Sequence, residues 1–364
     1  MNVWPGPGIA SASPIKAGGR ERFRLAFDNR DYPGARLLPA ALLCLLLLAG
    51  LLFPLVASAQ AGGYAGAFSR MGFGPRGMAM GNAMSAVTSE GIYPYYNPAF
   101  APSAVQGMGR QMDLSTSVMS FDRSLHKLSG SFALPSKAGI AVSIINARVS
   151  NIDGRTASGY HTRMLSTSEF QVGTAFGIRI TPAVRVGIGI KYYLADLHPE
   201  LQNATSFGFD IGGLFRVNEK LNLGVTVRDL MAKYSWDSGS FYGESSGTRS
   251  TDHFPWQVRL GGSCQLNENL MITLEPGILL PREDGSASIL QVRGGGSYHL
   301  HERVSLRAGW QLTDLQSAGN SNTLAAGFSL HLPFDLLSPS IDYAVVPEPN
   351  RVSMMHVFGL QLTL

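Results

Sequence analysis

Residues 184–192 read VRVGIGIKY, and in this stretch apolar residues alternate with Arg, Gly or Lys. Successive side chains of an extended strand point to opposite faces. One face of this strand is therefore purely aliphatic and aromatic and suits lipid, whereas the other suits water. The same alternation recurs at residues 304–312 and 322–332. A soluble β-sandwich also alternates in this way, so the connections between the strands must decide the fold class.

The connections between the predicted strands alternate between tight and long. The tight ones resemble one another and lie at residues 180–184, 217–221, 266–270 and 300–304. The long ones are rich in Ser, Gly, Asn and Asp, and include residues 150–163, 231–253 and 313–321. Short turns at one end and long loops at the other are typical of outer-membrane barrels, whose short turns face the periplasm.

The sequence predicts an all-β fold, a 14-stranded antiparallel transmembrane β-barrel. An even number of strands fits this class, and so do strands that exceed the roughly 9–11 residues needed to cross a bilayer at a tilt. The charged fraction of 15% is also below the roughly 25% of soluble domains. The predicted strands lie at residues 111–121, 126–134, 139–149, 164–180, 183–195, 204–217, 221–230, 254–266, 270–279, 288–300, 304–312, 322–332, 340–346 and 352–364.

A secretory leader is predicted ahead of the barrel. The apolar run at residues 37–56 follows Arg30 and Arg36 and precedes Ala57-Ser58-Ala59, which together are the three parts of a cleavable signal peptide. The alternative is an uncleaved transmembrane helix, since a run of this length could span a bilayer. We expect cleavage, followed by insertion into the outer membrane as a multi-pass barrel. The predicted parts are an N-terminal extension with the signal peptide at 1–59, a hatch or plug at 60–110 and the transmembrane barrel at 111–364.

The sequence contains no convincing catalytic set, metal-ligand cluster or phosphate-binding loop. We therefore expect no enzyme activity, no cofactor, no metal and no nucleic-acid partner. Of the two cysteines, Cys44 lies in the leader and Cys264 in a later strand, so the mature chain has no pair for an internal disulfide. The expected partners are outer-membrane lipid, a compound that enters the lumen or a protein that binds the loops.

Residues 72–100, GFGPRGMAMGNAMSAVTSEGIYPYYNPAF, differ in kind from the rest because they are rich in Gly, Met and small residues and lack strand alternation. A 14-stranded ring is wider than its own side chains can fill, so its lumen must be plugged or gated. We place this segment inside the ring as a plug made of a short helix and turns. Gly77 and Gly81 would let the backbone approach the inner wall. Asn97 before Pro98 favours a turn that the asparagine side chain caps.

This hatch segment resembles the FadL-like superfamily of outer-membrane hydrophobe transporters and, more closely, its PorV/PorQ branch. The resemblance lies in residues 74–83, GPRGMAMGNA, and in residues 95–99, YYNPA, with further similarity in the hairpins at 189–193 and 207–212. It implies a 14-stranded barrel with an inward-folded N-terminal hatch. The residues that match the hatch motif are Arg76, Gly77, Met80, Gly81, Asn82, Asn97, Pro98 and Ala99.

The resemblance implies two possible functions. On the PorV/PorQ side, which is the leading prediction, the barrel is an accessory or shuttle component of type IX-like protein secretion, with translocon components or secreted cargo proteins as partners. The alternative is FadL-like passive transport of long-chain fatty acids or other hydrophobic small molecules, in which the hatch blocks the lumen until the compound enters from outside and leaves laterally. A third reading is a structural barrel that stays shut. An apolar pocket under the hatch would favour transport, and contacts from the loop at 231–253 to a partner would favour export.

Charged residues at inward-facing strand positions predict a polar and mainly basic lumen. Water or plug atoms can solvate a charge there, whereas a charge at the lipid midplane costs ~2–4 kcal/mol. Such a lumen could favour an anionic headgroup or could balance acidic groups on the plug and the wall. Arg76 of the hatch is expected to pair with Asp210 or Glu275. The residues predicted to face the lumen are Arg185, Lys191, Asp210, Arg216, Arg259, Glu275, Arg293 and Arg307.

Overall fold

The structure is a computed structural model and describes residues 64–363 apart from residues 92, 103–109, 136, 238, 240–246, 283–285, 287, 314–321, 333, 335–337 and 350–352. The predicted leader at 1–59 lies outside the described residues, as does the loop at 314–321. No helix within the described ranges is long and apolar enough to span a membrane.

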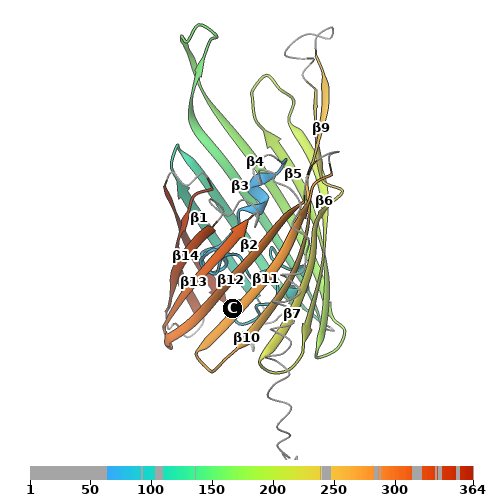
Figure 1. Cartoon of the computed structure of the whole chain (residues 1–364), viewed down its shortest axis with the longest axis vertical. Coiled ribbons are helices and arrows are strands. Elements are labelled where there is room, and N and C mark those ends of the chain that lie inside the picture. The colour runs from blue at the N-terminus through green and yellow to red at the C-terminus, as the bar shows by residue number, and fades with distance from the viewer. Residues whose placement is uncertain are drawn as a thin grey trace, which may run out of the picture. The chain divides into compact units, whose positions relative to one another are not determined.

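Fourteen antiparallel strands close into one barrel (Figure 1). Each strand pairs with its neighbours in the sequence, except that β7 pairs with β10, and β1 pairs with β16 to close the ring. A closed ring leaves no strand edge unpaired, which is what a lipid surrounding requires. The predicted 14-stranded antiparallel barrel is confirmed. Its strands are β1 (Arg110–Met119), β2 (Arg123–Leu134), β3 (Ala138–Arg155), β4 (His161–Arg179), β5 (Val184–Asp196), β6 (Ala204–Arg216), β7 (Leu221–Leu230), β10 (Trp256–Gln265), β11 (Leu270–Leu280), β12 (Ile289–His301), β13 (Val304–Thr313), β14 (Asn322–His331), β15 (Ser338–Pro347) and β16 (Met354–Thr363).

The two faces of the barrel wall differ as the alternation predicts. In β5, the side chain of Ile188 lies on the outer face and is 54% exposed, whereas Lys191 lies on the inner face and is 5% exposed. In β13, Leu306 is exposed on the outer face while Arg307 is buried inside. The outer face therefore carries the apolar side chains that suit lipid, and the charged side chains gather in the lumen.

Two of the short turns are stabilised by an asparagine at their second position. In the turn at 266–270, Leu266 N donates to Leu270 O at 2.9 Å, and Asn267 Oδ1 accepts hydrogen bonds from Asn269 N at 2.9 Å and Leu270 N at 2.8 Å. Asn218 makes the equivalent pair of bonds in the turn at 217–221. An asparagine that bonds to the backbone two residues further on mimics a turn, and so the repeated Asn sets the register of both hairpins.

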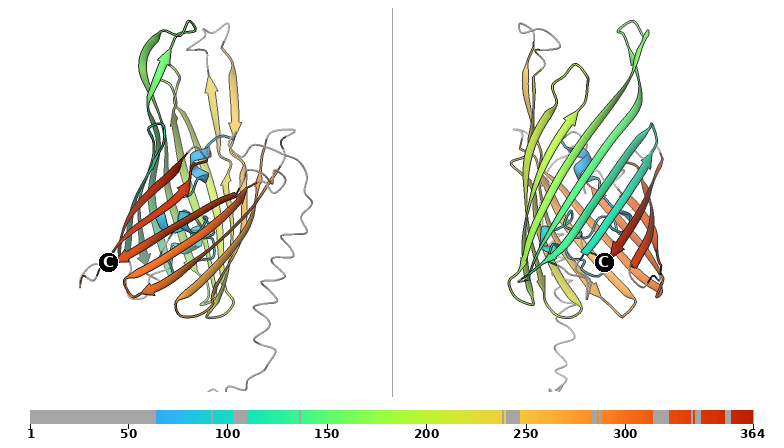
Figure 2. Two further views of the ribbon diagram at one scale, coloured as in Figure 1. Left: turned by 60° about the vertical axis from the view of Figure 1, so that its left-hand side comes forward. Right: turned by 180° about the vertical axis from the view of Figure 1, so that it is seen from behind.

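Two segments predicted as loops contain strands instead. Residues 150–163 continue β3 and β4 as a hairpin with register shifts after Val149 and Asp153. Residues 231–253 contain a separate two-stranded sheet, β8 (Lys233–Asp237) paired with β9 (Arg249–His253). Both hairpins extend beyond the barrel at the end opposite the short turns (Figures 1 and 2). Because a hairpin that is solvated on both faces has no hydrophobic period, sequence patterning does not separate it from a polar loop.

The chain between residues 64 and 102 runs inside the barrel wall (Figure 2). It contains η2 (Ala67–Arg70), α2 (Pro75–Ala79) and η3 (Pro98–Phe100), joined by turns, which agrees with the short helix and turns expected there. We call residues 64–102 the hatch. The apolar core of the molecule lies between the hatch and the inner face of the wall.

Asn267→Ala tests the role of the turn asparagines. The change removes an acceptor from two backbone N–H groups, so we expect the free energy of unfolding to fall by ~1–2 kcal/mol. Urea-induced unfolding of the barrel in lipid vesicles measures this difference. Lys220→Ala, an exposed side chain in the matching turn, is the control and should leave the unfolding free energy unchanged; an equal loss in both variants would contradict the assignment.

Candidate functional site

The hatch backbone touches the inner wall at a ring of glycines. A Cβ at Gly309 would lie 2.2 Å from Met80 C, and one at Gly187 would lie 2.4 Å from Pro98 C. No real side chain tolerates such distances to backbone atoms, so these strand positions require glycine because the hatch approaches so closely. We call this set the glycine ring. It comprises Gly139, Gly177, Gly187, Gly212, Gly224, Gly261, Gly295, Gly309, Gly327 and Gly359, on ten of the barrel strands.

Two buried ion pairs connect the hatch to the wall. Arg76 Nε lies 3.1 Å from both carboxylate oxygens of Asp342 in β15, and Arg76 Nη1 donates to Glu90 O at 2.7 Å. Arg307 Nε in β13 donates to Glu90 Oε2 at 2.8 Å. The predicted pairing of Arg76 with Asp210 or Glu275 is therefore wrong. The residue spacing predicted that Asp210 and Glu275 face inward, but it could not show at which height and on which side of the lumen Arg76 would sit.

Burial alone would raise the pKa of the Glu90 carboxyl group. The neighbouring guanidinium groups of Arg307 and Arg76 more than offset this effect and hold the pKa below its ordinary value. Glu90 is therefore a charged group in the hatch, although its side chain is almost completely buried.

Backbone groups of the hatch also bond to wall side chains. Ser85 N donates to Glu275 Oε2 at 2.8 Å. Ser263 Oγ donates to Ala86 O at 2.8 Å, and Thr273 Oγ1 donates to Ala83 O at 2.9 Å. These hatch segments have no regular secondary structure in which their backbone groups could pair. Wall side chains therefore serve as the hydrogen-bond partners of those groups.

The asparagine–proline turn is stabilised in the way the sequence predicts. Asn97 Oδ1 accepts a hydrogen bond from Ala99 N at 2.9 Å at the start of η3, so the capping role of Asn97 is confirmed. Its Nδ2 donates to Ser85 O at 2.8 Å and to Gly213 O of the wall at 3.0 Å. One side chain thus joins the turn, a second hatch segment and β6.

The other motif residues lie in the hatch core. Gly81 approaches the wall as predicted, since a Cβ there would lie 2.4 Å from Trp310 O. The prediction for Gly77 is wrong, because its close neighbour is the hydroxyl of Tyr96, another hatch residue. Asn82 has a positive φ of 62° and accepts a hydrogen bond from the same Tyr96 hydroxyl at 2.8 Å.

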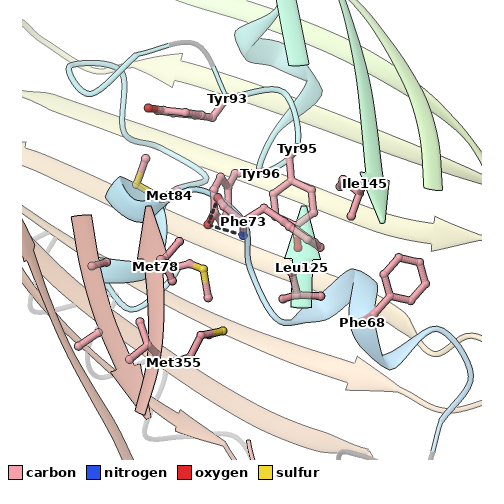
Figure 3. Packing of buried hydrophobic residues seen from close by; sticks show 14 of the residues in the cluster. Phe68, Phe73, Met78, Met84, Tyr93, Tyr95, Tyr96, Leu125, Ile145 and Met355 are labelled. Atoms are coloured by element: carbon pink, nitrogen blue, oxygen red, sulfur yellow. Dashed lines mark hydrogen bonds between the residues drawn. The ribbon is translucent and has the colours of Figure 1, made fainter. Parts of the chain in front are cut away.

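Aromatic and methionine side chains fill the space between the hatch and the wall (Figure 3). Tyr95 stands edge-on to both Phe73 and Tyr96, with ring centroids 5.1 and 4.8 Å apart. Figure 3 places these rings beside Leu125 and Ile145 of the wall. The hatch therefore contacts the wall through apolar side chains as well as through glycines and polar groups.

A second charged cluster lies beside these rings, and sequence reasoning missed half of it. Lys191 Nζ bridges Asp210 Oδ2 at 2.7 Å and Asp229 Oδ1 at 2.8 Å. Asp229 also accepts from Tyr193 Oη at 2.6 Å. By strand parity Asp229 should face lipid, because its neighbour Arg228 faces inward. A register shift between β6 and β7 and a φ of 61° at Asp229 turn its carboxylate inward. The sequence did contain a sign of this bulge. A carboxylate such as Asp229 at a lipid-facing strand position is energetically costly unless a bulge turns it inward.

The remaining predicted lumen residues fall into two groups. Arg259 and Arg293 are buried beside Glu275, with Nη1 atoms 3.5 and 3.6 Å from Glu275 Oε1. Arg185 and Arg216 lie at the short-turn ends of β5 and β6, where Arg185 is half-buried and Arg216 is exposed. Arg216 therefore lies at the rim rather than in the lumen interior, because it is the last residue of its strand.

A cavity lies between residues 94–98 of the hatch and the wall strands β2 to β6. The hatch contributes Pro94, Tyr95 and Pro98 to its lining. The wall contributes small apolar residues, polar residues and charged ones, among them Ala141, Ala175, Gln171, Lys127 and Lys191. The lining is therefore mixed rather than purely apolar. Since one side of it belongs to the hatch, a movement of the hatch would change the size of the cavity.

These features define a transmembrane barrel whose lumen is occupied by an N-terminal segment of its own chain. Three solved barrels have a similar fold. The toluene transporter TodX of Pseudomonas putida has a TM-score of 0.56 at 13% identity, over 80% of this chain and 96% of that one. The CymD monoaromatic hydrocarbon channel has a TM-score of 0.56 at 12% identity, over 80% and 97%. A FadL homologue of Pseudomonas aeruginosa has a TM-score of 0.52 at 11% identity, over 85% and 98%.

No family model and no curated protein matches the sequence. At identities this low, the structural likeness concerns the fold. It confirms the predicted resemblance to FadL-like barrels at that level. The finer placement in the PorV/PorQ branch stays a prediction.

Gly309→Ala tests the glycine ring. The added methyl group would meet hatch backbone at Met80 and Gly81, so we expect a displaced hatch, a lower unfolding temperature and faster proteolysis of the hatch. Gly189→Ala is the matched control, because its Cβ would face the lumen with its nearest neighbour, Asp210 Cβ, at 3.3 Å. Identical proteolysis of both variants would show that the ring does not position the hatch.

Glu90→Gln tests the charged contact between hatch and wall. A lowered pKa in the folded state means that Glu90 stabilises the fold fully above its unfolded pKa of ~4.3 and that this stability is lost as the pH falls through the lower folded pKa. We expect the wild-type unfolding temperature to drop below pH ~4.3, and we expect the variant to be less stable at neutral pH with a shallower acid decline. Parallel pH profiles of the two proteins would contradict this role.

Proposed function

We propose that this barrel passively conducts hydrophobic compounds across the outer membrane and that the hatch is its gate. The observation that carries the proposal is the closed hatch: residues 64–102 occupy the lumen of a FadL-like barrel and meet the wall at the glycine ring. A barrel filled in this way does not serve as an open water-filled pore. The similar structures are described as a toluene transporter and a monoaromatic hydrocarbon channel.

The cavity beside residues 94–98 of the hatch is a candidate binding site for the transported compound. Tyr95, Pro94 and Pro98 provide apolar surface from the hatch, and Ala141 and Ala175 provide it from the wall. Lys127, Gln171, Lys191 and Asp210 also line the cavity, and polar groups placed in this way fix the orientation of a ligand in small-molecule sites. Since the hatch supplies part of the lining, binding and gate movement would be coupled there.

The proposal includes the location and the division of the chain. An apolar outer face on a closed barrel supports residence in an outer membrane. We further propose that residues 1–59 are removed as the export leader and that residues 60–110 work as one hatch unit against a barrel of residues 111–364.

A reversible crosslink between hatch and wall tests the gate. A Cβ at Gly261 would lie 3.5 Å from Ala86 Cβ, which is within the range of disulfides; the only close neighbour on the way is the rotatable Ser85 hydroxyl. We propose Ala86→Cys with Gly261→Cys in a Cys264→Ala background. Uptake of a radiolabelled long-chain fatty acid and of a radiolabelled monoaromatic hydrocarbon would be measured in cells that express the barrel.

We expect the oxidised double variant to take up neither compound above the level of cells without the barrel, and reduction to restore uptake. Ala86→Cys alone in the same background should behave as wild type under both conditions. Uptake that continues through the locked barrel would exclude the hatch as the gate. The absence of uptake by the wild-type barrel for both compounds would reject the transport function itself.

A role in protein export is the second candidate, and one observation favours it. The β3–β4 and β8–β9 hairpins extend beyond the barrel and present exposed Tyr160 and Met164 near the tip of the longer one. Extended hairpins of this kind offer a surface to another protein. Mass spectrometry after gentle extraction separates the candidates, because a copurifying translocon component or secreted protein supports export, whereas bound hydrophobic compound without protein supports transport.

A further inference from the structure

Three buried arginines lie side by side on the inner wall beneath the hatch. Arg228 in β7 is opposite Gln257 in β10, and Arg259 is the next inward residue along β10. Arg293 in β12 is opposite Glu275 in β11, whose carboxylate lies near both Arg259 and Arg293. All three side chains are less than 5% exposed. We call Arg228, Arg259 and Arg293 the arginine belt.

Many donors of the arginine belt have no acceptor among the described residues. None of the three guanidinium nitrogens of Arg228 makes a hydrogen bond within that part of the chain, and the same holds for Arg259 Nε and for Arg293 Nε and Nη1. Arg228 Nε has one ion-pair contact, with Asp210 Oδ2 at 3.5 Å, and its guanidinium lies 4.5 Å from the Tyr95 ring centroid. Arginine presents five N–H donors, and leaving buried donors unmet costs about 1–3 kcal/mol each.

The charges around the arginine belt do not balance. Its carboxylate neighbours are Glu275, Asp210 and Asp229, and the last two are also paired with Lys191. Within the described part of the chain, the three arginines and Lys191 therefore place four cations against three carboxylates. Other buried charges of the described lumen are paired, as in Arg76 with Asp342, Arg307 with Glu90 and Lys127 with Asp113. Arg70, which also interacts with Asp229, has Glu169 as a neighbouring anion. One net positive charge in a buried place is unfavourable unless a negative charge joins it.

We propose that Arg228, Arg259 and Arg293 form a buried binding site for one monovalent anion, either a free halide or the carboxylate of an amphiphile. The anion supplies the missing acceptor and neutralises the excess charge. Access is through the cavity, because Tyr95 lines the cavity on one side and covers Arg228 on the other. The site would hold the hatch in place, since Tyr95 and the Glu275 partner Ser85 both belong to the hatch. This inference does not depend on the proposed transport function.

The direct test is a crystal structure of the full-length barrel grown in sodium bromide. We expect an anomalous bromide peak within hydrogen-bond distance of the Arg228 guanidinium and no such peak in Arg228→Gln. Water alone among the three arginines would overturn the proposal. Mass spectrometry of the organic extract of the same preparation distinguishes the sources: a stoichiometric carboxylate that bromide displaces identifies an amphiphile, and its absence beside a bromide peak identifies a halide site.

Thermal unfolding gives a second readout with a predicted sign for each variant. Because a ligand of the folded state raises stability with its concentration, the unfolding temperature of the wild type should rise and saturate with bromide at constant ionic strength. Arg228→Gln removes the excess charge and should weaken the apparent affinity at least about tenfold, whereas Glu275→Gln adds to that excess and should strengthen it. Arg123→Gln, which alters the ion pair with Glu348 and does not line the cavity, should respond as the wild type does. Equal bromide responses in all four proteins would overturn the site.

Discussion

The whole structure follows from the need to pair every backbone N–H and C=O group away from water. In lipid an extended chain meets this need only in a closed ring, and the pairing of β1 with β16 provides the closure. A ring of fourteen strands then leaves a lumen too wide for wall side chains alone. The hatch occupies that space, but it brings irregular backbone with it, whose polar groups must also be paired. Wall side chains such as Ser263, Thr273 and Glu275 meet that second need, so the polar lumen follows from the closed ring.

The period-two pattern predicts most of the barrel because lipid on one face and a polar interior on the other impose it on every strand. It fails where that asymmetry ends. Above the membrane, the hairpin of residues 150–163 has solvent on both faces, and its strands lose the pattern that would reveal them. At Asp229 the pattern is broken by a bulge, and only the cost of a lipid-facing carboxylate indicates that the chain turns there. The barrel strands are thus readable from the sequence, whereas the strands beyond the barrel are not.

The candidate site was predictable in part for a similar reason. Parity places Arg259, Glu275 and Arg293 inside the lumen, and the structure agrees. Parity says nothing about which inward residues share a height, because that depends on the stagger of the strands around the ring. The pairing of Arg76 with Asp342 rather than with Asp210 or Glu275 is a consequence of that stagger. The inward strand glycines of the glycine ring are visible in the sequence. The reason for glycine at these positions is seen only in the structure, where hatch atoms lie against them.

The composition of the contact between hatch and wall bears on whether the hatch can move. The large rings of Phe73, Tyr95 and Tyr96 pack against one another within the hatch. The wall meets the hatch through glycines, ion pairs and apolar side chains, such as Tyr193 edge-on to Phe68. Moving the hatch as a unit would keep the contacts among these three rings and would expose polar groups together with the apolar side chains that lie between hatch and wall. Breaking the hatch apart would expose the rings and would cost roughly 25 cal/mol for each Å² of apolar surface. Displacement as a rigid body is therefore the less costly opening, because it leaves these rings packed together. The ion pairs at Arg76 and Glu90 and the apolar contacts with the wall oppose it.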